Sequence, residues 1–139
     1  MASNALADSS YLFALFNTTD AQHHSARSVA EVYHINFVVP DVALTEVAFL
    51  FQRARGTSAV LGFLDALAIK QVRLQPVTFD TLRRAREIMG EYADSRLDFV
   101  DCCIMALAEQ LNITQVCTFD RRDFSIFRPK HCDYLELLP

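Results

Sequence analysis

The stretch DFVDCCIMALAEQL, residues 98–111, is apolar on nearly every side when it is drawn as a helix. A helix with this pattern is covered on more than one side, because a surface helix keeps a polar face toward water. Short apolar runs typical of strands lie before and after it, and they alternate with other helical segments along the chain. This alternation predicts an α/β domain with a mainly parallel sheet between layers of helices.

The other segments of the chain fit this architecture. The expected strands are residues 4–8, 35–40, 71–77, 114–119 and 132–138. The other expected helices are residues 9–17, 21–33, 41–55, 58–69 and 78–93. Asp41 is expected to cap the third of these helices and Gly56 to end it. In such sheets, functional sites form beyond the carboxyl ends of the strands, where the strand order reverses.

Composition is that of a single globular domain over residues 1–139. With 52% hydrophobic residues, three glycines and four prolines, the chain has no room for a flexible linker. No span of about 18 uninterrupted apolar residues is present, so we expect a cytoplasmic protein with no membrane partner. The four cysteines form no CxxC pair, which predicts free thiols and not a zinc site.

The charge balance limits the classes of partner. A net charge of −4 argues against broad nonspecific affinity for nucleic acid. All but Lys70 and Lys130 of the 13 basic residues are arginines, the residue suited to bidentate phosphate contacts.

Four acidic residues lack a basic partner nearby in the sequence. Asp8 ends the first expected strand and Asp120 ends residues 114–119, so both are expected at the same edge of the sheet. Glu46 and Asp101 lie on apolar helices and have no basic residue three or four positions away. Because an unpaired buried carboxylate costs several kcal/mol, a shared cation is the economical partner for all four.

Convergence of these carboxylates would have a chemical purpose. At about 5 Å and an effective dielectric of about 20, each like-charged pair costs roughly 3 kcal/mol. Such a cluster raises its own pKa values or binds a hard divalent cation, and an all-oxygen set favours Mg²⁺ or Mn²⁺. These cations activate water and stabilise charge on a leaving oxygen, so phosphodiester hydrolysis is the chemistry implied.

Each acid also has a structural interpretation. Asp8 can cap a helix at Ser9, Asp120 can be a turn residue, and Asp101 can be stabilised by the dipole at its helix start. Asp98 is expected to be the cap at the head of its helix, and it adds an extra carboxylate near the site. The coincidence of four acids favours a site over these separate interpretations.

The stretch around Asp120 has a further acid and two arginines. Asp123 either binds a metal through water or pairs with Arg121 or Arg122, and we favour the pairing. The two arginines either meet phosphate beside the site or form solvated ion pairs with Asp123. Phe119 and Phe124 are expected to pack this loop onto the core.

Four segments resemble the PIN-domain family, specifically VapC-type toxin ribonucleases of type II toxin–antitoxin pairs. They are LADSSYLFALF (6–16), VVPDVALTEV (38–47), LDFVDCCIMALAEQLNIT (97–114) and VCTFDRRDFSIFRP (116–129). They occur in family order over nearly the whole chain. The resemblance implies a three-layer α/β/α sandwich with a central, mainly parallel sheet of four to five strands.

The resemblance also implies a quartet of catalytic, metal-binding acids, which falls on Asp8, Glu46, Asp101 and Asp120. Hydroxyl groups beside such ligands would come from Ser9 or Ser10 and from Thr118. The implied activity is Mg²⁺- or Mn²⁺-dependent endonucleolytic cleavage of RNA by metal-activated water. The implied partners are an RNA substrate, a cognate antitoxin protein and a second copy of the chain in a homodimer.

Two other classes of function compete with this one. A non-catalytic PIN-like module that binds RNA or a partner is the alternative, although loss of a quartet acid would have favoured it. A haloacid-dehalogenase-like phosphatase is disfavoured, because Ser10 stands where such enzymes carry their second aspartate. A phosphotransfer receiver is disfavoured because no lysine follows a late strand.

Overall fold

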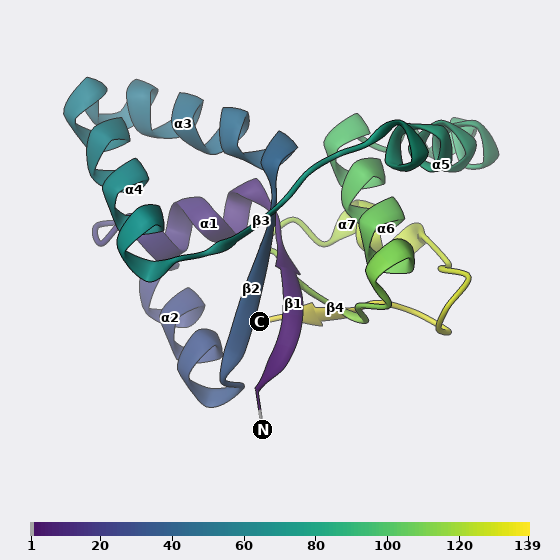
Figure 1. The fold of residues 1–139 in the computed structure, drawn as a ribbon, viewed down its shortest axis with the longest axis horizontal. Coiled ribbons are helices and arrows are strands. Elements are labelled where there is room, and N and C mark those ends of the chain that lie inside the picture. Colours follow the sequence, from purple (N-terminus) through teal and green to yellow (C-terminus); the bar gives the residue numbers. More distant parts are fainter. Residues whose placement is uncertain (1) are drawn as a thin grey trace.

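A sheet of five parallel strands forms the centre of the molecule (Figure 1). The computed structural model describes residues 2–139. The strand order is β3-β2-β1-β4-β5, and every neighbouring pair runs parallel. The strands are β1 (Ser3–Ala7), β2 (Ile35–Pro40), β3 (Arg73–Gln75), β4 (Gln115–Cys117) and β5 (Glu136–Leu138). The predicted α/β class with a mainly parallel sheet is confirmed.

The direction in which the chain adds strands reverses at β1. After β1, the chain adds β2 and β3 on one side, and it then returns to add β4 and β5 on the other. Leu6 in β1 pairs with both Val38 of β2 and Val116 of β4, so β1 is the central strand. The carboxyl ends of β1 and β4 therefore flank the reversal point, where open α/β sheets place their sites.

Helices cover both faces of the sheet and complete the three-layer sandwich. The helices are α1 (Ser9–Phe16), α2 (His23–Val32), α3 (Asp41–Arg55), α4 (Thr57–Lys70), α5 (Phe79–Glu91), α6 (Phe99–Leu111) and α7 (Arg122–Ile126), with a short 3₁₀ helix, η1 (Ala93–Ser95). In Figure 1, α1 to α4 lie on one side of the sheet and α5 to α7 on the other. Side chains of β1 alternate between the two cores: Ala5 and Ala7 face the first, and Leu6 faces the second.

Helix α6 is buried along most of its length, as its composition predicts. Residues 102–108 are all at most 1% exposed. The helix packs between the sheet and α5, and it also contacts α3 and α7. Asp98 caps it as expected, since its carboxylate accepts a 3.2 Å hydrogen bond from the Asp101 N–H. This contact fixes the first turn, which carries Asp101.

Truncation of Ile104 in the middle of α6 is expected to destabilise the fold strongly. Ile104 is fully buried, so Ile104→Ala should lower the free energy of unfolding by about 2–5 kcal/mol. Urea unfolding followed by circular dichroism measures this loss. Leu61→Ala in α4 is the control, because Leu61 is 56% exposed and its truncation should cost only about 0.5 kcal/mol. Equal losses for both variants would contradict the burial of α6.

The start of α3 differs from its expectation. Pro40 occupies the cap position, and Asp41 is the first residue within the helix, without a capping hydrogen bond. The Asp41 carboxylate instead accepts a 3.2 Å bond from the Val77 N–H, which ties α3 to the segment before α5. Gly56 ends the helix as expected, with a positive φ of 82°. The third, fourth and fifth strands are also shorter than predicted, at three residues each.

The stretch after Asp120 is a helix and not the expected loop. Helix α7 is short, and its apolar residue Phe124 is 1% exposed. Phe127, which directly follows the helix, is fully buried in the same core. Burial of these two rings holds one helical turn against α6, as the packing role predicted for Phe124 requires.

All four cysteines are free, as predicted, and Cys102, Cys103 and Cys117 are buried. None of the helices described in residues 2–139 is both long enough and apolar enough to cross a membrane.

Candidate active site

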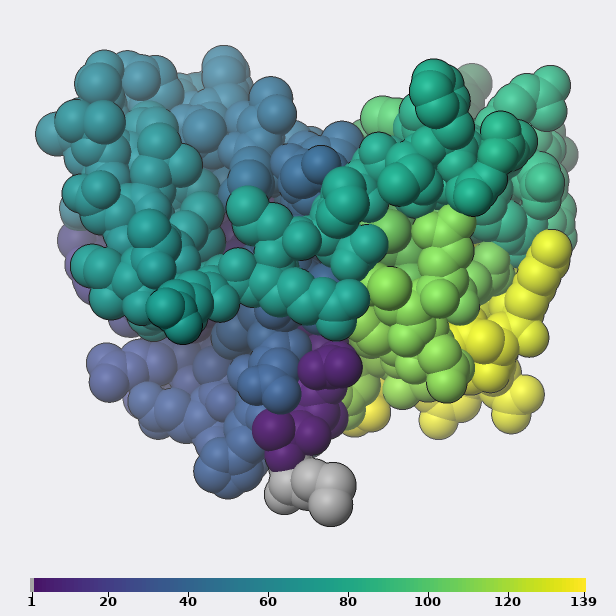
Figure 2. Space-filling view, in the orientation of Figure 1, coloured from purple at the N-terminus to yellow at the C-terminus, as the bar shows by residue number. Residues whose placement is uncertain are grey.

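Three of the predicted acids, Asp8, Asp101 and Asp120, lie near the carboxyl ends of β1 and β4. Asp8 directly follows β1, and Asp120 lies three residues beyond β4. Asp101 lies in the first turn of α6, and Glu46 lies in the second turn of α3. In Figure 2 the outline of the molecule is hollowed between the lobe of α3 and α4 and the lobe of α5, at the margin toward which β1 and β2 run in Figure 1.

Asp8 is a buried carboxylate that also caps α1. It is 4% exposed, and its Oδ1 accepts bonds from the Tyr11 N–H (2.9 Å) and the Ser10 hydroxyl (2.7 Å). Its Oδ2 accepts a hydrogen bond from the Thr118 hydroxyl. Burial raises the pKa of Asp8 to about 6, although these three hydrogen bonds oppose the rise and the charge of Asp120 adds to it. The cap at Ser9 is thus real, but burial still leaves Asp8 costly to ionise.

Two of the predicted hydroxyls join the ends of β1 and β4. The Thr118 side chain donates to Asp8 and accepts a 2.9 Å bond from the Asp120 N–H. The Ser10 side chain donates to Asp8 and accepts a 3.0 Å bond from the Phe119 N–H. Asp120 itself is exposed, with its backbone held in the turn by Thr118. Among the side-chain hydrogen bonds of the described residues, none involves Ser9, so the choice between the two serines falls on Ser10.

Removal of the Thr118 hydroxyl is expected to destabilise this junction. Thr118→Val keeps the shape of the side chain but leaves the Asp8 carboxylate without one donor and the Asp120 N–H without its acceptor. Because Thr118 is 1% exposed, the free energy of unfolding should fall by about 1–3 kcal/mol. Thr114→Val, at an exposed position, is the matched control. Denaturant unfolding at neutral pH measures both, and equal effects would show that the hydroxyl of Thr118 contributes nothing.

Asp101 has the most strongly raised pKa of the predicted acids. Burial is the main cause, followed by a hydrogen bond with the Asp123 carboxyl group and by the charges of Asp8, Asp98 and Asp123. Together they raise the pKa of Asp101 to about 9. Because the charge of Asp8 contributes to the raised pKa of Asp101, the first turn of α6 lies near the end of β1. An acid with this pKa keeps its proton at neutral pH unless a cation replaces it.

Asp123 is more deeply buried than its position in the sequence indicates. The favoured pairing is confirmed, because Arg122 Nη1 lies 2.7 Å from Asp123 Oδ1. Asp123 is also 7% exposed, accepts a 2.9 Å bond from the Asp98 N–H, and hydrogen-bonds Asp101. The burial of Asp123 could have been predicted from the helical spacing of the apolar residues in α7, because this spacing indicates that the turn packs against the core.

The two arginines have separate partners. Arg122 contacts Asp123 and donates to the Ser95 carbonyl oxygen. Arg121 does not pair with Asp123, and its Nη1 donates to the Pro139 carbonyl oxygen at 2.6 Å. The ion-pair interpretation therefore holds for Arg122 and is wrong for Arg121, since the side chain of Arg121 turns toward the end of β5. A phosphate contact by either arginine stays a prediction.

Glu46 is not among the charges that raise the pKa of Asp8 or of Asp101. It is half-buried on α3, and among the described residues its side chain has no hydrogen bond or ion pair. Within residues 2–139, no three acidic, histidine or cysteine side chains stand close enough together to hold one ion. The chemistry of the donor set still fits Mg²⁺ or Mn²⁺, because Asp8 and Asp101 are raised in pKa, supply only oxygen, and have no basic side chain against them in the described chain.

The chain is similar to known proteins over most of its length. Ribonuclease VapC26 of Mycobacterium tuberculosis is 27% identical over 122 residues, which cover 88% of this chain and 90% of that protein. The crystal structure of M. tuberculosis VapC20, described as a sarcin–ricin loop cleaving toxin, matches with a TM-score of 0.81 and 23% identity over 99% of this chain and 100% of that one.

Two complexes have the same fold. A toxin–antitoxin complex from Klebsiella pneumoniae matches with a TM-score of 0.66 and 20% identity, over 88% of this chain and 92% of that one. VapBC2 from Rickettsia felis, bound to a promoter DNA fragment, matches with a TM-score of 0.69 and 12% identity over 96% of each chain.

The family comparison covers the whole candidate site. The family model described as PIN domain matches residues 5–128, a range that includes all four predicted acids and Asp123. With the sandwich fold and the resemblance to VapC proteins both confirmed, the chain belongs to the PIN-domain family.

Proposed function

We propose that this chain is a Mg²⁺- or Mn²⁺-dependent endoribonuclease and the toxin component of a type II toxin–antitoxin pair. The observation that carries the proposal is the pair of carboxyl groups, Asp8 and Asp101, beyond the end of the central strand. Burial raises the pKa of both, and nearby charges add to the rise: Asp120 acts on Asp8, and Asp8 acts on Asp101. Membership of the PIN-domain family and the name of the relative Ribonuclease VapC26 support it. Such a cluster costs stability, so a catalytic purpose is the economical explanation.

Four carboxylates would hold the cation: Asp8, Glu46, Asp101 and Asp120. Bound there, a divalent cation would activate water for attack on phosphorus and stabilise charge on the leaving oxygen. The hydroxyls of Thr118 and Ser10 orient Asp8 by donating to its two oxygens. Asp98 orients Asp101 by capping the helix turn that carries it. The chain thus supplies a set of acids whose backbone positions are fixed before any ligand binds.

Mapping of RNA ends tests the activity. Total cellular RNA is incubated with the purified protein and Mn²⁺ or Mg²⁺, and the new ends are sequenced. We expect discrete, metal-dependent ends that a chelator abolishes and that Asp101→Asn does not produce. Absence of such ends, from protein that binds Mn²⁺ and carries no partner, would overturn the proposal.

The nature of the nucleophile gives a second test. Because water is the proposed nucleophile, the 2′-hydroxyl of the scissile nucleotide should be dispensable. An oligonucleotide with 2′-deoxy or 2′-methoxy at that position is expected to be cleaved. Resistance that arises solely from the missing hydroxyl would exclude hydrolysis by water.

The proposed partners follow from the same family. Two of the matching structures are described as a toxin–antitoxin complex and as VapBC2, and they support a cognate antitoxin for this chain. We also propose a homodimer. Light scattering during size-exclusion chromatography should then give twice the monomer mass of 15.7 kDa, and a monomer mass would contradict it.

A non-catalytic module that binds RNA or a partner is the second candidate function. It is favoured because, among residues 2–139, no three acidic, histidine or cysteine side chains stand close enough together to hold one ion. This module would bind RNA without generating metal-dependent ends, so the end-mapping experiment separates the two candidates.

A further inference from the structure

The segment that leads into α6 is held at two points by consecutive residues of α7. Arg122 donates to the carbonyl oxygen of Ser95, and Asp123 accepts from the Asp98 N–H at 2.9 Å. Arg122 and Asp123 are also paired with each other at 2.7 Å. Helix α7 is anchored in the core at this point, because Phe124, the residue after Asp123, is 1% exposed. Helix α7 and the start of α6 therefore form one rigid junction beside the proposed site.

The hydrogen bonds at the start of α6 form an incomplete capping box. In a capping box, the cap side chain accepts from the backbone N–H three residues on, and the side chain there accepts from the N–H of the cap residue. Helix α5 has both halves, because the hydroxyls of Thr78 and Thr81 accept from each other's backbone N–H at 3.4 and 3.3 Å. In α6, Asp98 accepts from the Asp101 N–H, but the Asp98 N–H goes to Asp123.

We propose that Asp123 is a positioning residue that takes the Asp98 N–H away from Asp101 and so keeps the Asp101 carboxylate on the side of Asp8. Asp101 is the residue that would otherwise close the box, because it lies three positions after the cap. If the Asp101 carboxylate accepted the Asp98 N–H, it would point toward the N-terminal end of α6 and away from Asp8. Because Asp123 accepts the Asp98 N–H, the Asp101 carboxyl group lies near Asp8 and Asp123. This inference rests on the proposed function of the site.

Substitution of Asp123 by alanine separates positioning from stability. With the acceptor removed, Asp101 is expected to turn back and close the capping box, so the fold loses little. The melting temperature of metal-free Asp123→Ala should stay within about 3 °C of the wild type. Affinity for Mn²⁺, measured by electron paramagnetic resonance, should weaken about 10–100-fold, as for other residues that orient metal ligands. The crystal structure of the variant should place an Asp101 oxygen about 3 Å from the Asp98 nitrogen.

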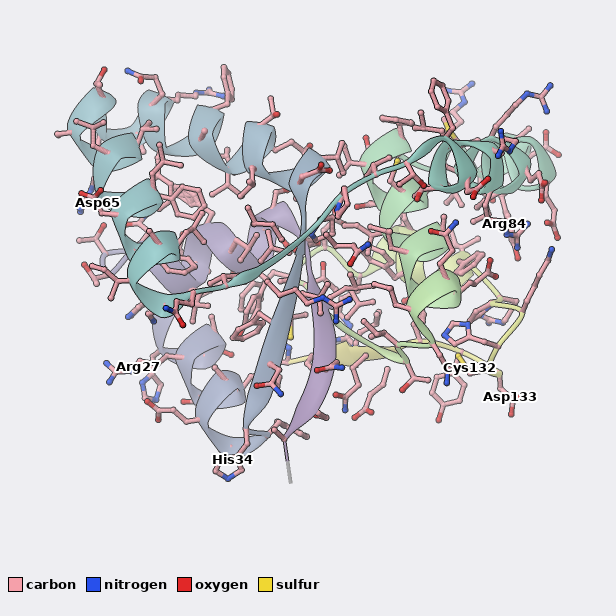
Figure 3. The ribbon with its side chains drawn as sticks, in the orientation of Figure 1. Arg27, His34, Asp65, Arg84, Cys132 and Asp133 are labelled. Atoms are coloured by element: carbon pink, nitrogen blue, oxygen red, sulfur yellow. The ribbon has the colours of Figure 1, made fainter. Side chains whose placement is uncertain are left out.

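A conservative variant and a distant control sharpen the experiment. Asp123→Asn keeps an oxygen that accepts the Asp98 N–H, so it should restore most of the Mn²⁺ affinity. Asp65→Ala should leave the affinity unchanged, because Asp65 is exposed on α4, on the other side of the molecule (Figure 3).

Three outcomes would overturn the inference. Affinity as weak in Asp123→Asn as in Asp123→Ala would make Asp123 a direct ligand. A large fall in melting temperature with unchanged Mn²⁺ affinity would make it merely structural. An Asp101 side chain that keeps its position in the crystal structure of Asp123→Ala would also refute the inference. This last result needs no metal, so it decides the matter even where the wild type cleaves no RNA and the proposed function fails.

Discussion

Replacement of Asp101 by asparagine is expected to reduce RNA cleavage by about 10³-fold or more, because an amide cannot supply the negative charge that holds a divalent cation at the transition state. The variant keeps the size of the side chain and the N–H that Asp98 caps. Cleavage of the mapped RNA substrate at saturating Mn²⁺ measures the loss. Asp65→Asn, in an exposed part of α4, is the matched control and should be fully active.

The same variant has a second, opposite effect. In metal-free protein at neutral pH, Asp101→Asn should unfold at a higher temperature than the wild type, since the amide removes a carboxyl group that burial and its neighbours disfavour in the charged form. Inactive protein with unchanged or raised melting temperature would identify a functional acid. Inactive protein with a lowered melting temperature would identify a structural one, and this would contradict the proposed role.

The stability of the metal-free protein is expected to fall as the pH rises. The pKa values in the folded state are about 9 for Asp101 and about 6 for Asp8, both above the ordinary value of 3.8. Between about pH 4 and these values, the folded state holds protons that the unfolded chain has released. Each such proton lowers the free energy of unfolding by about 1.4 kcal/mol per pH unit. Because Asp101 is only partly buried, we expect a net loss of roughly 2 kcal/mol between about pH 5 and pH 8.

Urea unfolding in a chelator at several pH values measures this slope. Asp101→Asn should flatten it, because the amide does not titrate. Mn²⁺ should restore stability most at the upper end of the range, where the carboxyl groups give up their protons to the metal most readily. An identical slope in wild type and Asp101→Asn would show that Asp101 does not retain its proton in the folded state.

The main features of the fold could be predicted from local patterns. The composition of residues 98–111 placed α6 between layers, and the alternation of strands and helices gave a parallel sheet. The same rule put Asp8 and Asp120 at one edge of that sheet, where the structure has them. These predictions succeeded because periodicity and strand ends are properties of neighbouring residues.

The features that the sequence could not reveal depend on contacts between distant residues. From the sequence, Asp123 was expected only to pair with Arg122. The five residues of α7 contain no pattern that predicts the hydrogen bond between Asp123 and Asp98, 25 positions earlier. Asp41 looked like a cap, because the competing contact with Val77 comes from another segment. Arg84 likewise pairs with Glu109 of α6, a partner that lies outside the reach of spacing rules (Figure 3).

The reversal of strand order at β1 has a consequence for protein synthesis. Thr118 and Asp8 are 110 positions apart, and the chain must add β2 and β3 before β4 can pair with β1. Contacts of such long sequence separation form late, since closure of the long intervening loop must come first. A nascent chain on the ribosome that still lacks residues 115–120 therefore has Asp8 without its Thr118 partner. The proposed nuclease activity would therefore appear only after residues 115–120 have left the ribosome, so synthesis of the first four fifths of the printed sequence would precede any attack on RNA.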